Sequence, residues 1–166
     1  PVAGGTLRAE GYGIDYRLDL ISNFTYFTDP LQGDQFEQFD RRHIVGGELR
    51  FERPVTWADM PGEFQAGLQL RHDDIDPVGL YRTRERVRLS TVREDAVRQS
   101  SESAFVSQSL HWTPWLRTEA GLRADLFQFS VDSSLAVNSG RARDSIVSPK
   151  LSTVFGPWAH TELFLN

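Results

Sequence analysis

The sequence predicts an all-β fold, an antiparallel meander of about seven strands. Two observations support this prediction: several segments alternate apolar and polar residues with a period of two, and polar stretches rich in glycine and proline separate them. The clearest strand is 116–131, where Leu122 and Arg123 fall on opposite faces. No apolar run approaches the roughly 18 residues of a membrane helix. An alternating sheet covers its apolar face either with a protein core or with lipid.

The opening stretch, 14–27, is the most regular of these segments. Its polar face carries alternating charges at Asp15, Arg17 and Asp19. Its apolar face consists of Ile14, Tyr16, Leu18, Leu20, Phe24 and Tyr26. Residues 7–10 alternate in the opposite phase, so we expect a β-bulge at 11–13 within one long strand, with a tight turn as the alternative.

The remaining strands follow in order along the chain. Alternation predicts them at 43–53, 64–72, 105–112, 116–131, 146–155 and 159–166. The connections are expected at 29–41, 54–62, 73–102, 113–115, 132–145 and 156–158, alternately longer and shorter. Within 73–102, residues 87–91 have the composition of a strand that reaches beyond the sheet.

The four tryptophans lie at or beside the shorter connections. They are Trp57, Trp112, Trp115 and Trp158. Outer-membrane barrels have short periplasmic turns, long outer loops and aromatic residues at both membrane interfaces. The pattern therefore favours a transmembrane β-barrel over a soluble sandwich, with the longer connections outside the cell and the tryptophans at the interface.

Charges of both signs alternate on the polar faces of the predicted strands. Neighbouring strands would bring Asp15, Arg17 and Asp19 close to Glu48, Arg50 and Glu52. In a barrel these side chains would face the water-filled lumen. The expected lumen-facing residues are Asp15, Arg17, Asp19, Glu48, Arg50, Glu52, Arg117, Glu119, Arg123 and Asp125.

Composition excludes several classes of function. The formal net charge is −5 and no basic patch stands out in the sequence, which argues against a nucleic-acid partner. The chain has no cysteine, so disulfides, zinc thiolates and cysteine nucleophiles are excluded. Because 166 residues hold about seven strands, we expect residues 1–166 to be one part of a larger barrel.

Several motifs, in order, resemble the barrel of a TonB-dependent receptor. They are 16–27, 33–38, 69–74, 112–117 (Trp-Thr-Pro-Trp-Leu-Arg), 138–140, 148–150 and 155–162 (Phe-Gly-Pro-Trp-Ala-His-Thr-Glu). The resemblance implies a 22-stranded outer-membrane transporter that imports a scarce nutrient with energy relayed by TonB. It also implies that the plug domain lies outside this chain, that the plug, TonB and lipid are partners, and that outer loops bind a small molecule.

Two more specific functional interpretations, a cation site and a hydrolase site, stay open. His72, Asp73, Asp74 and Asp76 would suit a hard cation, although a solvated charged loop explains them better. Ser107, Ser109 and His111 alternate on one strand face, as in an outer-membrane hydrolase, although lumen-lining polar residues explain them better. We expect no catalytic, cofactor-binding or metal-binding residue, and keep an outer-membrane enzyme and a soluble sandwich binding module as alternatives.

Overall fold

The computed structural model of the protein describes residues 3–23, 29, 31 and 33–166. Within this part of the chain, one sheet holds seven antiparallel strands in sequence order. The strands are β1 (Thr6–Asn23), β2 (Gln35–Trp57), β3 (Met60–Arg84), β4 (Val87–Thr113), β5 (Leu116–Ser133), β6 (Gly140–Trp158) and β7 (Thr161–Leu165). A short 3₁₀ helix, η1 (Ala136–Asn138), connects β5 and β6. The predicted all-β meander is therefore confirmed.

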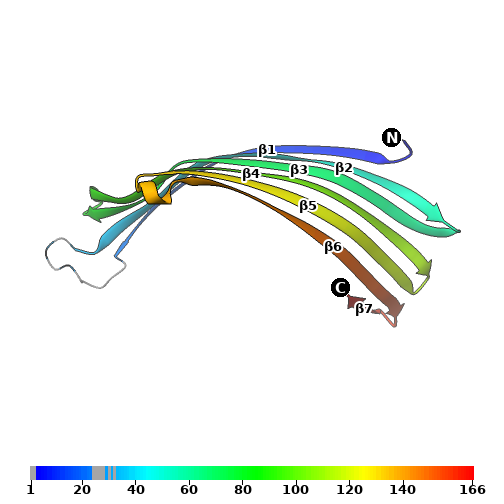
Figure 1. Ribbon diagram of the computed structural model, residues 1–166. Helices are drawn as coiled ribbons and strands as arrows, with labels where there is room; N and C mark the ends of the chain where they lie inside the picture. Colours follow the sequence, from blue (N-terminus) through cyan, green and yellow to red (C-terminus); the bar gives the residue numbers. More distant parts are fainter. Residues whose placement is uncertain (1–2, 24–28, 30, 32) are drawn as a thin grey trace.

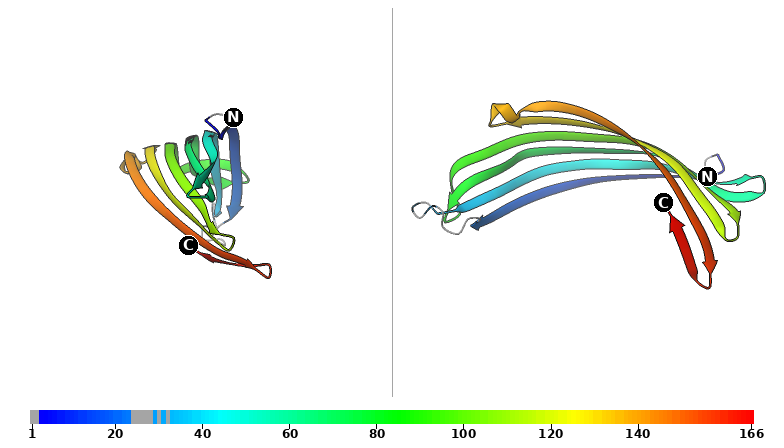
Figure 2. Two further views of the ribbon diagram at one scale, coloured as in Figure 1. Left: turned by 90° about the vertical axis from the view of Figure 1, so that its right-hand side faces the viewer. Right: turned by 60° about the horizontal axis from the view of Figure 1, so that its bottom comes forward.

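The sheet is a single open layer. Figures 1 and 2 show long, strongly curved strands, with β1 at one edge and the short β7 at the other. The accessible surface is 11,916 Å², whereas a compact 18.9 kDa domain exposes about 8,300 Å². Among the described residues, the buried apolar side chains are only Ile44, Ile75, Tyr81 and Val154. The sheet has no second layer and almost no core of its own.

Tight turns connect most of the strands. The two-residue turns 58–59, 85–86 and 159–160 have positive φ at both positions, the twist that suits a long hairpin. Residues 114–115 connect β4 and β5, while 24–34 and 134–139 form the longer connections. Two ends can thus be defined: the tryptophan end, with turns 58–59, 114–115 and 159–160, and the far end, with connections 24–34, 85–86 and 134–139.

The predicted long loop at 73–102 is wrong. β3 and β4 run through it as one hairpin to a turn at 85–86, which confirms the strand predicted at 87–91. Register shifts between Ile75 and Val78, and again near Tyr81 and Thr83, absorb the irregular sequence as β-bulges. The connections predicted at 54–62 and 132–145 also shrink, because β2 ends at Trp57 and β6 begins at Gly140.

The predicted bulge at 11–13 is also wrong, as is the alternative tight turn. β1 pairs with β2 in one unbroken register from Thr6↔Glu52 to Asn23↔Gln35. Side chains therefore keep strict alternation through the glycines, and Arg8 and Glu10 share a face with Ile14 and Tyr16. Residues 24–27 of the opening stretch, and Pro30 and Gln32 of the connection after it, lie outside the described residues.

Among the described residues, no helix is both long enough and apolar enough to cross a membrane.

Candidate functional site

The two faces of the sheet are the candidate functional surfaces, and the strand register assigns each residue to one of them. Residues paired across neighbouring strands point to the same side, and successive residues point to opposite sides. One register row consists of Ala9, Leu49, Leu68, Ala104, Ala124 and Val147. The adjacent row, on the other side, consists of Arg8, Arg50, Gly67, Phe105, Arg123 and Ser148. The alternation seen in single strands is thus coherent across six strands.

We call the first side the apolar face. Its central part carries large apolar side chains that are exposed to solvent, and we call this part the apolar band. The band includes Leu7, Val45, Leu49, Leu68, Leu70, Val106, Leu122, Leu126, Val147, Leu151, Leu163 and Leu165, all exposed by 40% or more. From Val147 to Phe155 the band runs about 26 Å along the strand. At a strand tilt of about 40° this length spans about 20 Å of height, against the roughly 25 Å apolar height of an outer-membrane barrel.

The apolar band ends along a line that crosses the strands. Toward the far end, beyond Val45, one register row on the same face consists of Asp15, His43, Asp74, Arg98, Ser130 and Arg141. On β4 and β6 polar residues begin two register rows earlier, at Glu102 and Ser145, so the six strands change from apolar to polar within two register rows of each other. A boundary shared by six strands is the pattern expected of a membrane interface rather than of separate strand sequences.

We call the opposite side the ionic face, where side-chain bonds join four strands. Gln69 on β3 is the centre: its Nε2 donates to Glu48 Oε2 over 2.6 Å, and its Oε1 accepts from Arg123 Nη1 over 2.8 Å. Arg123 Nε donates to Asp125 Oδ1 over 2.8 Å, and Ser103 Oγ donates to the same oxygen over 2.6 Å. This network connects β2, β3, β4 and β5.

The other expected lumen residues of the ionic face are also paired. Arg50 lies 2.6 Å from Glu48, and Lys150 Nζ lies 3.0 Å from Glu119. Two further ion pairs join Arg8 to Glu52 and Arg117 to Glu162. Seven of the ten expected residues therefore share this face: Glu48, Arg50, Glu52, Arg117, Glu119, Arg123 and Asp125.

Asp15, Arg17 and Asp19 do not share that face, so their expected closeness to Glu48, Arg50 and Glu52 is wrong. They pair with His43, Arg41 and Phe39, respectively, on the apolar face beyond the band. The physical reason is the missing bulge: unbroken alternation through Gly11 and Gly13 puts Leu7 and Ala9 on the same face as these charges. Ile14 and Tyr16 consequently point to the ionic face.

Sequence reasoning missed several residues of the ionic face. Asp73 is fully buried, and its carboxylate accepts from Arg71 Nε over 2.7 Å and from Gln99 Nε2 over 3.0 Å. The alternation of Gln69 and Arg71 against Leu68 and Leu70 already indicated their side of the sheet. The partner Gln99 was missed because it lies in the segment predicted as a loop.

A second cluster lies at the far end, on the apolar face beyond the band. Arg88 on β4 donates two hydrogen bonds to Glu37 on β2, over 2.7 and 2.6 Å, and its guanidinium stacks 3.7 Å from the Tyr81 ring centre. Burial and the hydrogen bond from its hydroxyl to Glu94 raise the pKa of Tyr81 to about 12. These contacts hold β2, β3 and β4 together where they project past the band.

All four tryptophans lie at the tryptophan end, as their sequence positions predict. The rings of Trp115 and Trp158 stack with centres 6.3 Å apart, and Trp112 Nε1 donates to Thr118 Oγ1 over 2.7 Å. The exposed fractions are 45% for Trp112 and Trp115, 52% for Trp158 and 66% for Trp57. Large exposed aromatic rings with polar edges suit the boundary between lipid and water.

Neither the cation site nor the hydrolase site considered from the sequence is assembled among the described residues. Asp73 and Asp74 lie on opposite faces, and no group of three or more possible metal ligands forms in this part of the chain. Ser109 Oγ bonds the backbone of Glu63. No hydrogen bond within the described residues joins Ser109 to His111.

No protein-family model matches the sequence, and no curated protein matches it either.

Proposed function

We propose that this chain is part of the barrel of an outer-membrane TonB-dependent transporter, with the apolar face toward lipid and the ionic face toward the lumen. The observation that carries the proposal is the exposed apolar band on one side of a single-layer sheet, opposite the bonded network of Gln69 and Arg123. In water such a band is unfavourable, whereas lipid covers it at no cost.

Strand length also supports a large receptor barrel. β2, β3 and β4 have 23, 25 and 27 residues, whereas crossing a bilayer takes about 9–11 residues of a tilted strand. The excess lies at the far end, where polar contacts replace the band. The sequence motifs that resemble a TonB-dependent receptor support a role in transport. In such a transporter a plug domain would pack on the ionic face. A depression of about 300 Å³ there is lined by Arg50, Gln69, Arg123 and Lys150, among others.

The transported substrate is a scarce nutrient of the siderophore, cofactor or carbohydrate type, bound at the projecting far end. Uptake by such a transporter needs no covalent chemistry from this chain. The partners are the lipid of the outer membrane, the plug domain and the TonB complex.

Cysteine labelling in the intact receptor tests the location and the orientation together. The chain has no native cysteine, so single substitutions give clean signals. Val137 lies at the far end and is 91% exposed, whereas Pro114 lies in the turn between β4 and β5 at the tryptophan end. On intact cells, Val137→Cys should react with a membrane-impermeant maleimide, and Pro114→Cys should react only after the outer membrane is permeabilised.

Each other labelling result has a definite meaning. The reverse pattern would invert the orientation of the barrel. Equal labelling of both variants on intact cells would contradict a membrane-spanning sheet. It would favour the soluble sandwich as the class of protein.

A further inference from the structure

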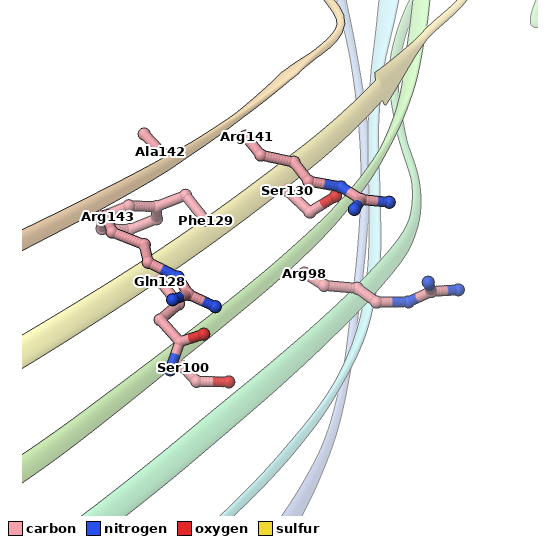
Figure 3. Close-up of a pocket in the computed structure, with 8 residues that line it drawn as sticks. All are labelled: Arg98, Ser100, Gln128, Phe129, Ser130, Arg141, Ala142 and Arg143. Carbon is pink, nitrogen blue, oxygen red and sulfur yellow. The ribbon is translucent and has the colours of Figure 1, made fainter.

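Three arginines gather on the apolar face just beyond the apolar band, and we call them the arginine patch: Arg98 on β4, and Arg141 and Arg143 on β6. Register places Arg98 beside Ser130 and Arg141, and the next row places Arg143 beside Gln128 and Ser100. The patch borders a depression of about 480 Å³ (Figure 3). In Figure 3 the arginine, serine and Gln128 side chains lie on one side of the ribbons, and the Phe129 ring lies on the other.

The guanidinium groups of the patch are largely free to bind a ligand. Within the described residues, Arg141 and Arg143 have neither an ion pair nor a side-chain hydrogen bond, and both are exposed. Arg98 makes only a long ion pair, 3.6 Å from Asp74, with 68% of its side chain exposed. On this face Asp74 shares the register row of Arg98, Glu102 lies one row from the patch on the side of the band, and Asp132 lies one row from it on the other side. The arginines of the ionic face, by contrast, are bonded to carboxylates at close range.

The position of the arginine patch, at the edge of the apolar band, indicates which kind of ligand it binds. An arginine at the bilayer midplane costs about 2–4 kcal/mol, but an arginine at the edge of the apolar region reaches the headgroups. Arg143 is two register rows from Val147, the last large side chain of the band on β6. Arginine binds phosphate oxygens through two parallel N–H donors, and Gln128, Ser100 and Ser130 add neutral donors.

We propose that the arginine patch binds the phosphate of an anionic lipid headgroup whose acyl chains lie against the apolar band. This proposal rests on the membrane location proposed above and adds a specific lipid site to it. The free guanidinium groups supply the charge complementarity, and the continuity of the patch with the band supplies a place for the acyl chains. The site would anchor the barrel at one depth and hold an ordered lipid against β4, β5 and β6.

Native mass spectrometry of the intact receptor in nonionic detergent tests the lipid site. The probes are phosphatidic acid, phosphatidylcholine with the same acyl chains, and inorganic phosphate. The wild-type receptor should retain phosphatidic acid in preference to phosphatidylcholine, and inorganic phosphate at equal concentration should not displace it. Since each arginine near a lipid surface contributes about fivefold in affinity, the double variant Arg141→Gln/Arg143→Gln should bind phosphatidic acid about 25-fold more weakly.

Arg86→Gln is the matched control. Arg86 lies at the hairpin tip, 12 residues from Arg98, and its side chain has no ion pair in the described part of the chain. This variant should retain phosphatidic acid like the wild type. Neither substitution removes a bond that holds the sheet, so both variants should keep the wild-type unfolding midpoint in detergent.

Two outcomes would overturn the lipid site. One is equal retention of phosphatidic acid by the wild type and the double variant. The other is displacement by inorganic phosphate at equal concentration, which would make the patch a site for free anions. Both outcomes leave the membrane location intact, because labelling at Val137 and Pro114 decides that question separately.

Discussion

Replacing Leu122 with arginine is expected to destabilise the intact barrel by about 2–4 kcal/mol. Leu122 lies in the middle of the apolar band, between Val106 on β4 and Pro149 on β6, and 49% of it is exposed. In the proposed membrane this exposed surface contacts lipid, so a guanidinium there loses its hydration without gaining a partner. Urea unfolding of the receptor in lipid measures the change in free energy.

Ser148→Arg is the matched control for this substitution. Ser148 pairs with Arg123 on the ionic face, one residue along β6 from the partner of Leu122, so both arginines enter at the same depth. Lys150, Glu119 and Arg123 line the same depression as Ser148, which water or polar groups can fill. We expect Ser148→Arg to cost less than about 1 kcal/mol, the range of an ordinary surface substitution. Equal costs at the two positions would refute the assignment of the faces.

The isolated 166-residue chain is expected to aggregate in buffer without detergent. It exposes the whole apolar band, and its sheet has open edges at β1 and β7. Exposed edges and large apolar patches both drive association between copies of a chain. Size-exclusion chromatography with light scattering should therefore find large assemblies, and detergent should restore smaller, strand-rich species.

A stable soluble monomer would contradict this expectation. The specific observation would be a cooperative thermal unfolding transition of a monodisperse 19 kDa species in plain buffer. That result would show that the apolar face is covered by some other part of the chain, as in a sandwich.

The segment 116–131 shows what the sequence could predict. Its alternation assigned Leu122 and Arg123 to opposite faces, and the structure places them so, within β5. This succeeded because the segment crosses the band, where one face is consistently apolar and the other consistently polar. The class of fold, the number of strands and the gathering of the tryptophans at one end rest on the same local signals.

The opening stretch shows why local signals fail elsewhere. Beyond the band both faces of a strand meet water or other polar groups, so the charges of Asp15 and Arg17 do not indicate which face of the strand is the ionic face. Glycines at 11 and 13 carry no side chain to reveal the phase of the strand. Only the partner strand, through the pair Glu10↔Glu48, fixes the assignment.

The prediction of a loop at 73–102, where β3 and β4 form a hairpin, was wrong for a related reason. Its charges suggested a loop, yet Arg88 and Glu37 are paired across 51 residues of sequence and lie over Tyr81. A contact between non-adjacent strands cannot be read from one strand alone. The arginine patch is of the same kind, since its members come from β4 and β6.

Oxygen accessibility of spin labels along β5 tests the central claim most directly, namely that the apolar face contacts lipid. Single cysteines at positions 118–126 of the reconstituted receptor carry the label, and molecular oxygen concentrates in the lipid. We predict a period of two, with oxygen collision maxima at the even positions, including Leu122 and Ala124, and minima at the odd positions, including Gly121. A profile without alternation, or one in which a water-soluble relaxant reaches the even positions best, would contradict it.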